Sequence, residues 1–322
     1  MKIAFLSDLH INIGTYGGVD KDGISFRTRD FINAFSWAVS KIIDEIKPDA
    51  VAILGDIYEN VQPSNTIRRM FNSQIRRLNS AGITVHLLVG NHDACKTNHS
   101  LEPLEGMQIP NVFVYYSPTI IHPKDKRDPV ILVFPHSQPV ERKEIGIRES
   151  FLDSVKSWVP IVKKAEGDDR QSILLGHFPI RGAFVSKGQR DEREANICFD
   201  DIDLLSPTYA LFGDFHSFQI LGSKTKAMYV GSLERSTFND IDGKKGFVVY
   251  DSAGVGDPIL GENLYFVEYP NPRPMILLKG NNDELASQLA SVKEGDIKEA
   301  IVKIQFVGER GQYLDFESEK PK

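Results

Sequence analysis

The sequence predicts an α/β protein in which a large domain is followed by a small one. Two observations predict this class. Short apolar runs alternate twice with helix-like patterns in the first third of the chain, and a proline-rich stretch at residues 270–274 precedes a further strand, helix and strand. The composition agrees, since 322 residues with 41% hydrophobic and 25% charged side chains are typical of a folded globular protein.

The first three strands and two helices follow from the spacing of apolar residues. Phe31 and Phe35 belong to a helical repeat, which predicts a helix over residues 29–45 that ends before Pro48. Ser64 is expected to cap a second helix and Gly82 to end it. The apolar runs around these helices predict buried strands at residues 2–7, 50–54 and 83–89. Strands joined through helices form a parallel sheet with right-handed crossovers.

The rest of the chain is less regular. Apolar runs predict strands at residues 112–116, 130–134, 172–175, 209–212, 229–230, 246–250 and 264–268, and a helix at residues 145–164. After the proline-rich stretch we expect a strand at residues 275–278, a helix at 283–292, a strand at 300–306 and a frayed tail at 317–322. The chain should therefore form one domain over residues 1–269 and another over residues 270–322.

Charge and cysteine content exclude several classes of protein. The net charge of -6 gives no global basic character, although a local basic groove or bound metal ions could still attract nucleic acid. Cys95 and Cys198 are too few for a disulfide framework, so a reducing cytoplasm is expected. No apolar run is long enough to span a membrane. Asp8 and His10 interrupt the apolar start, which we interpret as a strand and not a signal peptide.

Five segments share one layout, an apolar strand that ends in residues of metal-binding type. They are Asp8-x-His10, Gly55-Asp56, Gly90-Asn91-His92-Asp93, Gly176-His177 and Gly213-Asp214-x-His216. Taken singly, a Gly-Asp pair is ordinary turn chemistry and an Asp-x-His pair is more often coincidence. Together they bring carboxylate, amide and imidazole donors from several directions to one sheet edge, as a pair of divalent ions requires. The remaining histidines are expected to be hydrogen-bonded or solvated: His86, His99, His122 and His136.

These five segments resemble the pattern of calcineurin-type metallophosphoesterases. Arg29-Asp30-Phe31 with Ala34-Phe35, and the segment 231–238 followed by Lys245-Gly246-Phe247, further resemble the SbcD-like nuclease subunits of DNA double-strand-break repair. The resemblance covers residues 1 to about 250 well and implies a metallophosphoesterase β-sandwich flanked by helices, with a small α/β C-terminal capping domain. The chain length suits a short, phage-type version, in which the segment that docks the ATPase is shorter or lies outside this sequence.

The resemblance also implies roles for the strand-end residues. One ion would be held by Asp8, His10, Asp56 and His216, and the other by Asp56, Asn91, His177 and Asp214, so that Asp56 bridges them. His92 would contact the scissile phosphate or protonate the leaving oxygen, with Asp93 as its orienting partner. Manganese is the usual metal, and magnesium is possible. The family has histidine where Asp214 stands, so we expect the second ion to be less electrophilic here.

The activity implied is that of a metal-dependent DNA nuclease, an exonuclease on duplexes and an endonuclease on single strands, in DNA repair and recombination. The implied partners are DNA and a coiled-coil ATPase of the SbcC type. The complex would contain two copies of this chain and would not be bound to a membrane. The implied location is a bacterial or phage-infected cytoplasm. No Gly-x-x-x-x-Gly-Lys-Ser/Thr motif occurs, so this chain is not the ATPase.

Two alternatives stay open. One is a phosphatase or cyclic-nucleotide phosphodiesterase with the same core, and the other is a DNA-end binder whose catalysis is disabled at Asp214. The basic residues give two candidate contacts with DNA. One is a helix that carries Arg68, Arg69, Arg76 and Arg77, whose side chains are either solvated or bound to phosphate. The other is the loop between the two late histidine segments, and it is the better candidate. This loop carries Arg181, Lys187, Arg190 and Arg193.

Overall fold

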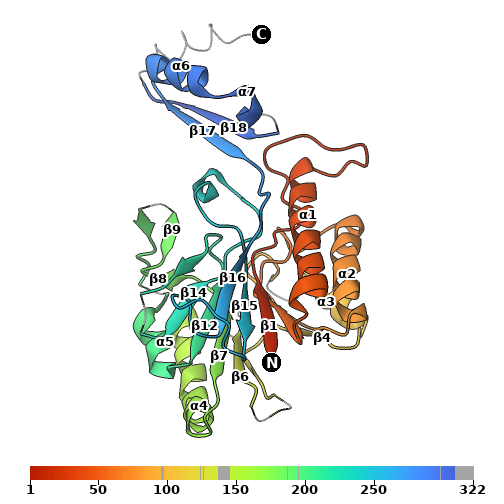
Figure 1. The fold of residues 1–322 in the computed structure, drawn as a ribbon, viewed down its shortest axis with the longest axis vertical. Helices are drawn as coiled ribbons and strands as arrows, with labels where there is room; N and C mark the ends of the chain where they lie inside the picture. Colours follow the sequence, from red (N-terminus) through yellow and green to blue (C-terminus); the bar gives the residue numbers. More distant parts are fainter. Residues whose placement is uncertain are drawn as a thin grey trace.

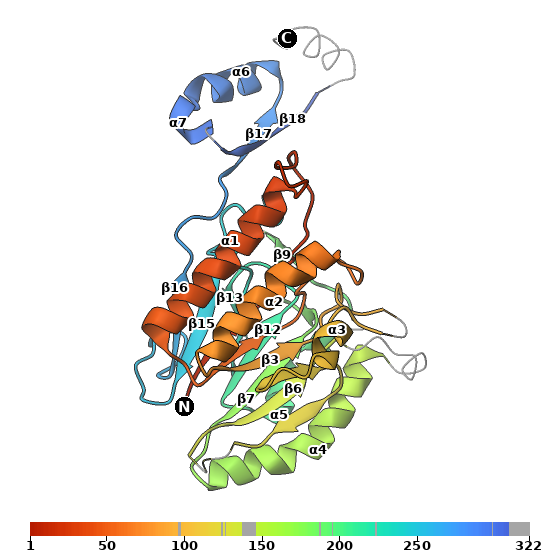
Figure 2. The ribbon, with the colours of Figure 1, turned by 90° about the vertical axis from the view of Figure 1, so that its right-hand side faces the viewer.

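Strands with apolar residues on both faces lie at the centre of the fold. In β1 (Lys2–Leu6), Ile3 and Phe5 enter one core and Ala4 and Leu6 enter another. The computed structural model accordingly stacks two sheets between outer helices (Figures 1 and 2). It describes residues 1–95, 98–123, 125, 127–136, 146–186, 188–194, 196–222, 224–297 and 299–308. Lys187 and the tail predicted at residues 317–322 lie outside these ranges.

The first sheet has the strand order β16-β15-β1-β2-β3-β4. Its other strands are β2 (Ala50–Ile53), β3 (Thr84–Leu88), β4 (Val112–Tyr115), β15 (Gly246–Asp251) and β16 (Leu264–Glu268). The strands β1 to β4 pair in parallel, which confirms the predicted parallel pairing, whereas β15 pairs antiparallel with β1 and β16 antiparallel with β15. The crossover helices α1 (Phe26–Lys41), α2 (Asn65–Ser80) and the short α3 (Glu102–Gly106) cover the outer face.

The second sheet has the order β13-β14-β12-β7-β6-β5. These strands are β5 (Thr119–Ile121), β6 (Val130–Phe134), β7 (Ser172–His177), β12 (Tyr209–Gly213), β13 (Gln219–Ile220) and β14 (Lys226–Tyr229). The helices α4 (Ile147–Gly167) and α5 (Phe199–Leu205) pack on its outer face. A third core, to which both sheets contribute, fills the space between them, so the predicted sandwich is confirmed.

The element boundaries differ from the predictions where capping decides them. α1 begins at Phe26 because the Ser25 hydroxyl accepts a hydrogen bond from the Arg27 backbone N–H at 3.2 Å. It continues into a π-helical turn (Ile42–Ile46), after which Lys47 adopts a left-handed conformation before Pro48. Six strands of two or three residues were not predicted. They are β5 and β13, given above, and β8 (Ile180–Arg181), β9 (Phe184–Ser186), β10 (Gln189–Arg190) and β11 (Ile197–Cys198).

The C-terminal module lies beyond the sandwich, at the top of Figure 1. It contains β17 (Met275–Gly280), α6 (Asn282–Ser291), α7 (Glu294–Ile297) and β18 (Ile301–Phe306), with β17 and β18 paired in parallel. Arg273 ties its linker to the sandwich. The Arg273 guanidinium binds Asp30 of α1, and its backbone N–H donates to Glu234 at 2.9 Å. Both carboxylates are buried, so the linker is anchored where the module begins.

Candidate metal centre

The predicted strand ends converge at one edge of the sandwich. The carboxyl ends of β1, β2 and β3 share the edge of one sheet, and those of β7 and β12 share the edge of the other. Backbone hydrogen bonds join the loops, from the Asp8 N–H to the Gly55 carbonyl at 3.2 Å and from the His10 N–H to the Asp56 carbonyl at 2.9 Å. Asp8, His10 and Asp56 are buried. The sandwich therefore places side chains that are distant in sequence around one centre.

Unusual backbone geometry aims these side chains. Asp8, His10, Asp56 and Asp214 all have positive φ angles, a conformation that costs free energy in residues other than glycine and that collects at functional sites. Gly90 is needed for a different reason, the space around it. Its φ is not positive, and a Cβ built on it would lie 2.1 Å from the Asp56 backbone nitrogen, so glycine is required for close approach of the two loops.

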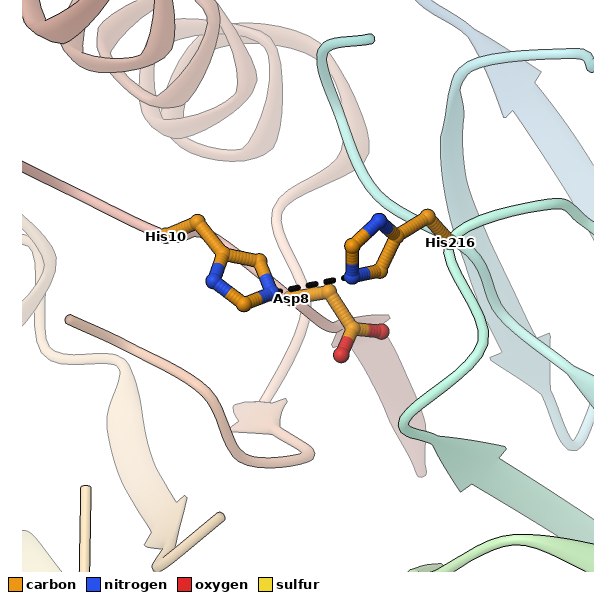
Figure 3. A group of neighbouring side chains, drawn as sticks. All are labelled: Asp8, His10 and His216. Atoms are coloured by element: carbon orange, nitrogen blue, oxygen red, sulfur yellow. Dashed lines mark hydrogen bonds between the residues drawn. The ribbon is translucent and has the colours of Figure 1, made fainter. Parts of the chain in front are cut away.

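One half of the cluster contains Asp8, His10 and His216, whose donor atoms all lie within 4.8 Å of one another (Figure 3). The Nε2 atoms of His10 and His216 are only 3.0 Å apart. The buried Asp8 Oδ2 has no hydrogen-bond partner among the described residues. An unpartnered buried carboxylate oxygen beside two facing imidazole nitrogens is a donor set that fits a divalent cation.

The other half of the cluster surrounds His177. Its Nε2 lies 2.8 Å from Asn91 Oδ1, 3.3 Å from Asp56 Oδ1 and 4.0 Å from Asp214 Oδ1. The second oxygen of Asp56 is 3.6 Å from His10 Nε2. Asp56 thus has one oxygen toward each half, which is the geometry that a bridging carboxylate needs. The seven predicted ligands lie together, and their assignment to two ions remains a prediction.

Each histidine of the cluster directs Nδ1 outward to an oxygen. His177 Nδ1 lies 2.6 Å from the Leu54 carbonyl, and His10 Nδ1 lies 2.8 Å from Glu59 Oε2. His216 Nδ1 lies 3.7 Å from Asp240 Oδ2. An imidazole whose Nδ1–H donates in this way leaves the lone pair of Nε2 for the cluster, and such outer contacts orient metal-binding histidines.

The buried carboxylates of the cluster favour positive charge on the groups around them. Burial disfavours the charged form of His177, yet Asp56 and Asp8 outweigh it and raise the pKa of His177 to about 10. Burial likewise opposes charge on His10, but the hydrogen bond to Glu59 and the charge of Asp56 raise its pKa to about 9. Burial raises the pKa of Asp214 to about 6. Bound cations would satisfy the same demand.

His92 and Asp93 take separate positions. The His92 ring lies 4.8 Å from that of His10, centroid to centroid, and its Nδ1 lies 2.9 Å from the Glu59 carbonyl. The expected pairing of Asp93 with His92 is not what the structure shows. Asp93 is fully buried and accepts hydrogen bonds from the backbone N–H groups of Ile57, Tyr58 and Gly90 and from the Ser100 hydroxyl. Asp93 therefore fixes two turns, and the Glu59 carbonyl orients His92.

Glu59 is a site residue that the sequence analysis missed. Its carboxylate contacts His10 while its carbonyl contacts His92, so one residue orients both rings. Despite partial burial, the hydrogen bond to His10 and the nearby histidines lower the pKa of Glu59. Its position three residues after Asp56 was the available signal. Spacing alone does not show which carboxylate receives a ring N–H.

The segment after the last predicted ligand supports His216 from behind. The Ser232 N–H donates to the His216 carbonyl at 3.0 Å, and the Lys245 ammonium donates to the same oxygen at 2.9 Å. Lys245 is fully buried, and burial lowers its pKa. Lys245 also donates to the Ser232 hydroxyl at 2.9 Å. The 231–238 segment and Lys245 therefore fix the loop that carries His216.

Most of the remaining histidines lie as expected. His86 bonds the Tyr115 hydroxyl at 2.9 Å, His99 stacks on Tyr116, and His122 is exposed. His136 borders the cluster, with its ring 6.5 Å from that of His177. Cys95 and Cys198 are not joined by a disulfide bond. None of the helices in the described ranges combines the length and apolar character needed to cross a membrane.

Two of the loop arginines make contacts within their own loop. Arg193 forms an ion pair with Asp191 at 2.7 Å, although its side chain is 65% exposed. The Arg190 guanidinium lies over the Phe184 ring and donates to the Gly182 carbonyl at 2.8 Å. Both cations stay on the surface, and a role in binding DNA remains a prediction.

The fold and the cluster define this chain as a metal-dependent phosphoesterase. The chain belongs to the calcineurin-like phosphoesterase family, whose model matches residues 1–218. Two curated relatives are the SbcD subunits of the nuclease SbcCD from Escherichia coli strain K12 and from E. coli O157:H7. Each is 25% identical over 259 residues, which cover 75% of this chain and 63% of the relative. This chain thus spans less than two thirds of their length.

One solved structure found in the comparison is a dimetal phosphatase from Danio rerio. It is 11% identical, with a TM-score of 0.48, and the alignment covers 78% of this chain and 92% of that one.

Proposed function

We propose that this chain is a DNA nuclease subunit that hydrolyses phosphodiester bonds with two divalent ions, Mn²⁺ or Mg²⁺. The observation that carries the proposal is the strand-end cluster in which Asp56 lies between His10 and His177. The resemblance to the SbcD subunits of a nuclease supports DNA as the substrate. The proposed activities are exonuclease on duplexes and endonuclease on single strands.

The proposed ligands follow the two halves of the cluster. Asp8, His10, Asp56 and His216 would hold one ion, and Asp56, Asn91, His177 and Asp214 the other. When bound, the two ions would supply Lewis acidity that makes a water nucleophilic at neutral pH and offsets charge on the phosphoryl oxygens. The three carboxylates among the proposed ligands would leave one net positive charge against two divalent ions, and a histidine at 214 would leave two.

A side chain of the protein would protonate the leaving group. His92 lies beside His10 at the margin of the cluster and is only half-buried, so its ring can reach a phosphodiester seated there. With its Nδ1–H held by the Glu59 carbonyl, the doubly protonated His92 ring would carry its second proton on Nε2, directed away from that anchor, and could give this proton to the departing sugar oxygen. Asp93 would contribute by holding the turn that carries His92.

The proposed assembly follows the relatives. A coiled-coil ATPase of the SbcC type would handle duplex ends, and two copies of this chain would act in one complex in the cytoplasm. Residues 270–322 would form a capping domain that presents DNA to the site on residues 1–269. Two cysteines that form no disulfide with each other fit a reducing compartment.

The test compares substrates on the purified chain with Mn²⁺. Single-stranded DNA, linear duplex, p-nitrophenyl phosphate and a cyclic nucleotide are each incubated with wild type and with Asp56→Ala. The proposal expects release of nucleotides from DNA that Asp56→Ala abolishes. Faster hydrolysis of the phosphomonoester or cyclic nucleotide than of any DNA would instead establish the phosphatase or phosphodiesterase alternative. Metal binding with no hydrolysis of any substrate would establish the disabled DNA-end binder.

A further inference from the structure

His136 lies beside the candidate metal centre, although it is neither a predicted ligand nor the proposed acid. It follows β6, whose last residue Phe134 pairs in parallel with Gly176, the residue before His177. The two strands therefore end side by side at the edge of the second sheet that carries the cluster. The His136 ring lies 6.5 Å from the His177 ring, centroid to centroid, at an interplanar angle of 89°. A third strand end of this sheet thus brings a side chain to the cluster.

A backbone hydrogen bond fixes the position from which this ring extends. The His136 N–H donates to the Val89 carbonyl at 3.0 Å, and Val89 is only 1% exposed, so water does not compete for the bond. Two residues after Val89 comes Asn91, whose Oδ1 lies 2.8 Å from His177 Nε2. The bond therefore joins the end of one sheet to the end of the other, on the side of the cluster where Asn91 and His177 meet.

Two histidines outside the predicted ligand set thus flank the cluster, one beside each half. His92 lies beside His10, with ring centroids 4.8 Å apart, and His136 lies beside His177. Between them, one oxygen of Asp56 is 3.6 Å from His10 Nε2 and the other is 3.3 Å from His177 Nε2. His92 and His136 are both half-buried, so each ring keeps part of its surface open to a ligand. A phosphate group that spans the two proposed ion positions would have a histidine at each end.

The half around His177 is where a bound phosphate most needs a hydrogen-bond donor. Asp56 Oδ1 and Asp214 Oδ1 lie 3.3 and 4.0 Å from His177 Nε2, so two carboxylates face this half. Carboxylates repel the oxygens of a phosphate. A neutral imidazole carries one N–H in either tautomer, and its hydrogen bond to a charged oxygen is roughly twice as strong as one to a neutral oxygen. A donor from His136 would therefore offset part of the repulsion that Asp214 adds.

We propose that His136 contacts the substrate and donates a hydrogen bond to a phosphate oxygen seated on the His177 side of the metal centre. The proposal rests on the proposed two-ion hydrolysis, but it does not require that the phosphoester be DNA. His92 would serve the leaving oxygen at one end of the phosphate, and His136 would hold a non-bridging oxygen at the other. His136 should therefore strengthen the binding of any phosphate group, whereas His92 should act mainly on bond cleavage.

The test measures phosphate binding and hydrolysis separately. His136→Leu removes the donor at similar size, and His136→Gln keeps an amide N–H. The matched control is His122→Leu, the same change at an exposed histidine that follows β5. Calorimetry gives the Kd of inorganic phosphate for the Mn²⁺-loaded chain, and bis(p-nitrophenyl) phosphate gives kcat and KM.

His136→Leu should raise the Kd of phosphate and lower kcat/KM, each by about tenfold or more, because a hydrogen bond to a charged group is lost. His136→Gln should recover part of both losses, and His122→Leu should match wild type. If His136→Leu does not fold, His136→Ala takes its place, since it removes the donor without adding bulk. Titration of Mn²⁺ into the stripped variants should give the affinity of wild type.

Each other outcome decides between the two proposals. A wild-type Kd and kcat/KM in His136→Leu would overturn the role of His136 and leave the nuclease proposal standing. Weaker Mn²⁺ binding in this variant would also overturn it, because His136 would then support the ions and not the phosphate. If the variant loses phosphate affinity while wild type releases no nucleotides from DNA, the role of His136 stands and the nuclease proposal fails.

Discussion

Removing the Glu59 carboxylate should weaken the binding of one metal ion by about tenfold. Glu59 Oε2 lies 2.8 Å from His10 Nδ1 and fixes the orientation of that ring. Loss of an outer hydrogen-bond partner of a metal ligand typically costs about 10–100-fold in affinity. Because 33% of the Glu59 side chain is exposed, solvent screens its charge, and we expect the lower end of this range. Glu59→Gln, which keeps an acceptor oxygen, should cost about tenfold, equal to about 1.4 kcal/mol, and Glu59→Ala about thirtyfold.

Calorimetric titration of Mn²⁺ into EDTA-stripped protein would measure this loss. The ion near His10 should weaken, while the ion near His177 should keep its affinity, because Glu59 contacts His10 and not His177. At saturating Mn²⁺ the rate should largely recover, since His92 is held by the Glu59 backbone carbonyl, which the substitutions retain. Glu105→Gln, which removes a carboxylate 3.8 Å from His99, is the matched control. Unchanged Mn²⁺ affinity in Glu59→Ala, or equal weakening of both ions, would refute the reasoning.

Four further predictions concern the cluster. His92→Gln should lower the rate about 10²–10⁴-fold through loss of the proton donor while both ions still bind, as rate and metal stoichiometry would show; a lost ion would disprove this role. In a Mn²⁺ titration, Asp56→Ala should abolish the binding of both ions and Asn91→Ala should weaken the binding of only one. If Asp56→Ala still bound one ion tightly, Asp56 would not be a bridging ligand. Asp214→His should raise the Mn²⁺-dependent rate if the native carboxylate is disabling, whereas a slower variant would identify Asp214 as a working ligand. In EDTA, Tm should fall as pH rises from 6.5 to about 9, because the raised pKa of His10 stabilises the fold below 6.5 and that stability is lost as the ring deprotonates; a flat Tm would contradict it.

Local patterns were sufficient to predict the ends of the central strands. In β1 and β2 every second apolar residue faces one of two cores, so the runs are apolar throughout and stop where the loop begins. The residues after those stops, such as Asp8 and Asp56, could therefore be placed at a common edge from the sequence alone. The Ser64 cap of α2 was predictable for the same reason, since the bond from the Ile67 N–H spans three residues.

The tertiary structure decided which side chains orient the site. Glu59 contacts His10 across 49 positions of sequence, and Lys245 holds His216 across 29. The spacing of residues along the sequence does not predict such contacts, because they depend on how the loops approach one another after the two sheets have packed. The same holds for Asp93, whose position beside His92 suggested a partner but whose carboxylate is used by the N–H groups of two neighbouring turns. Sequence determines a strand and its end because the interactions are local, whereas the partner of a buried polar group is chosen by the packing of distant segments.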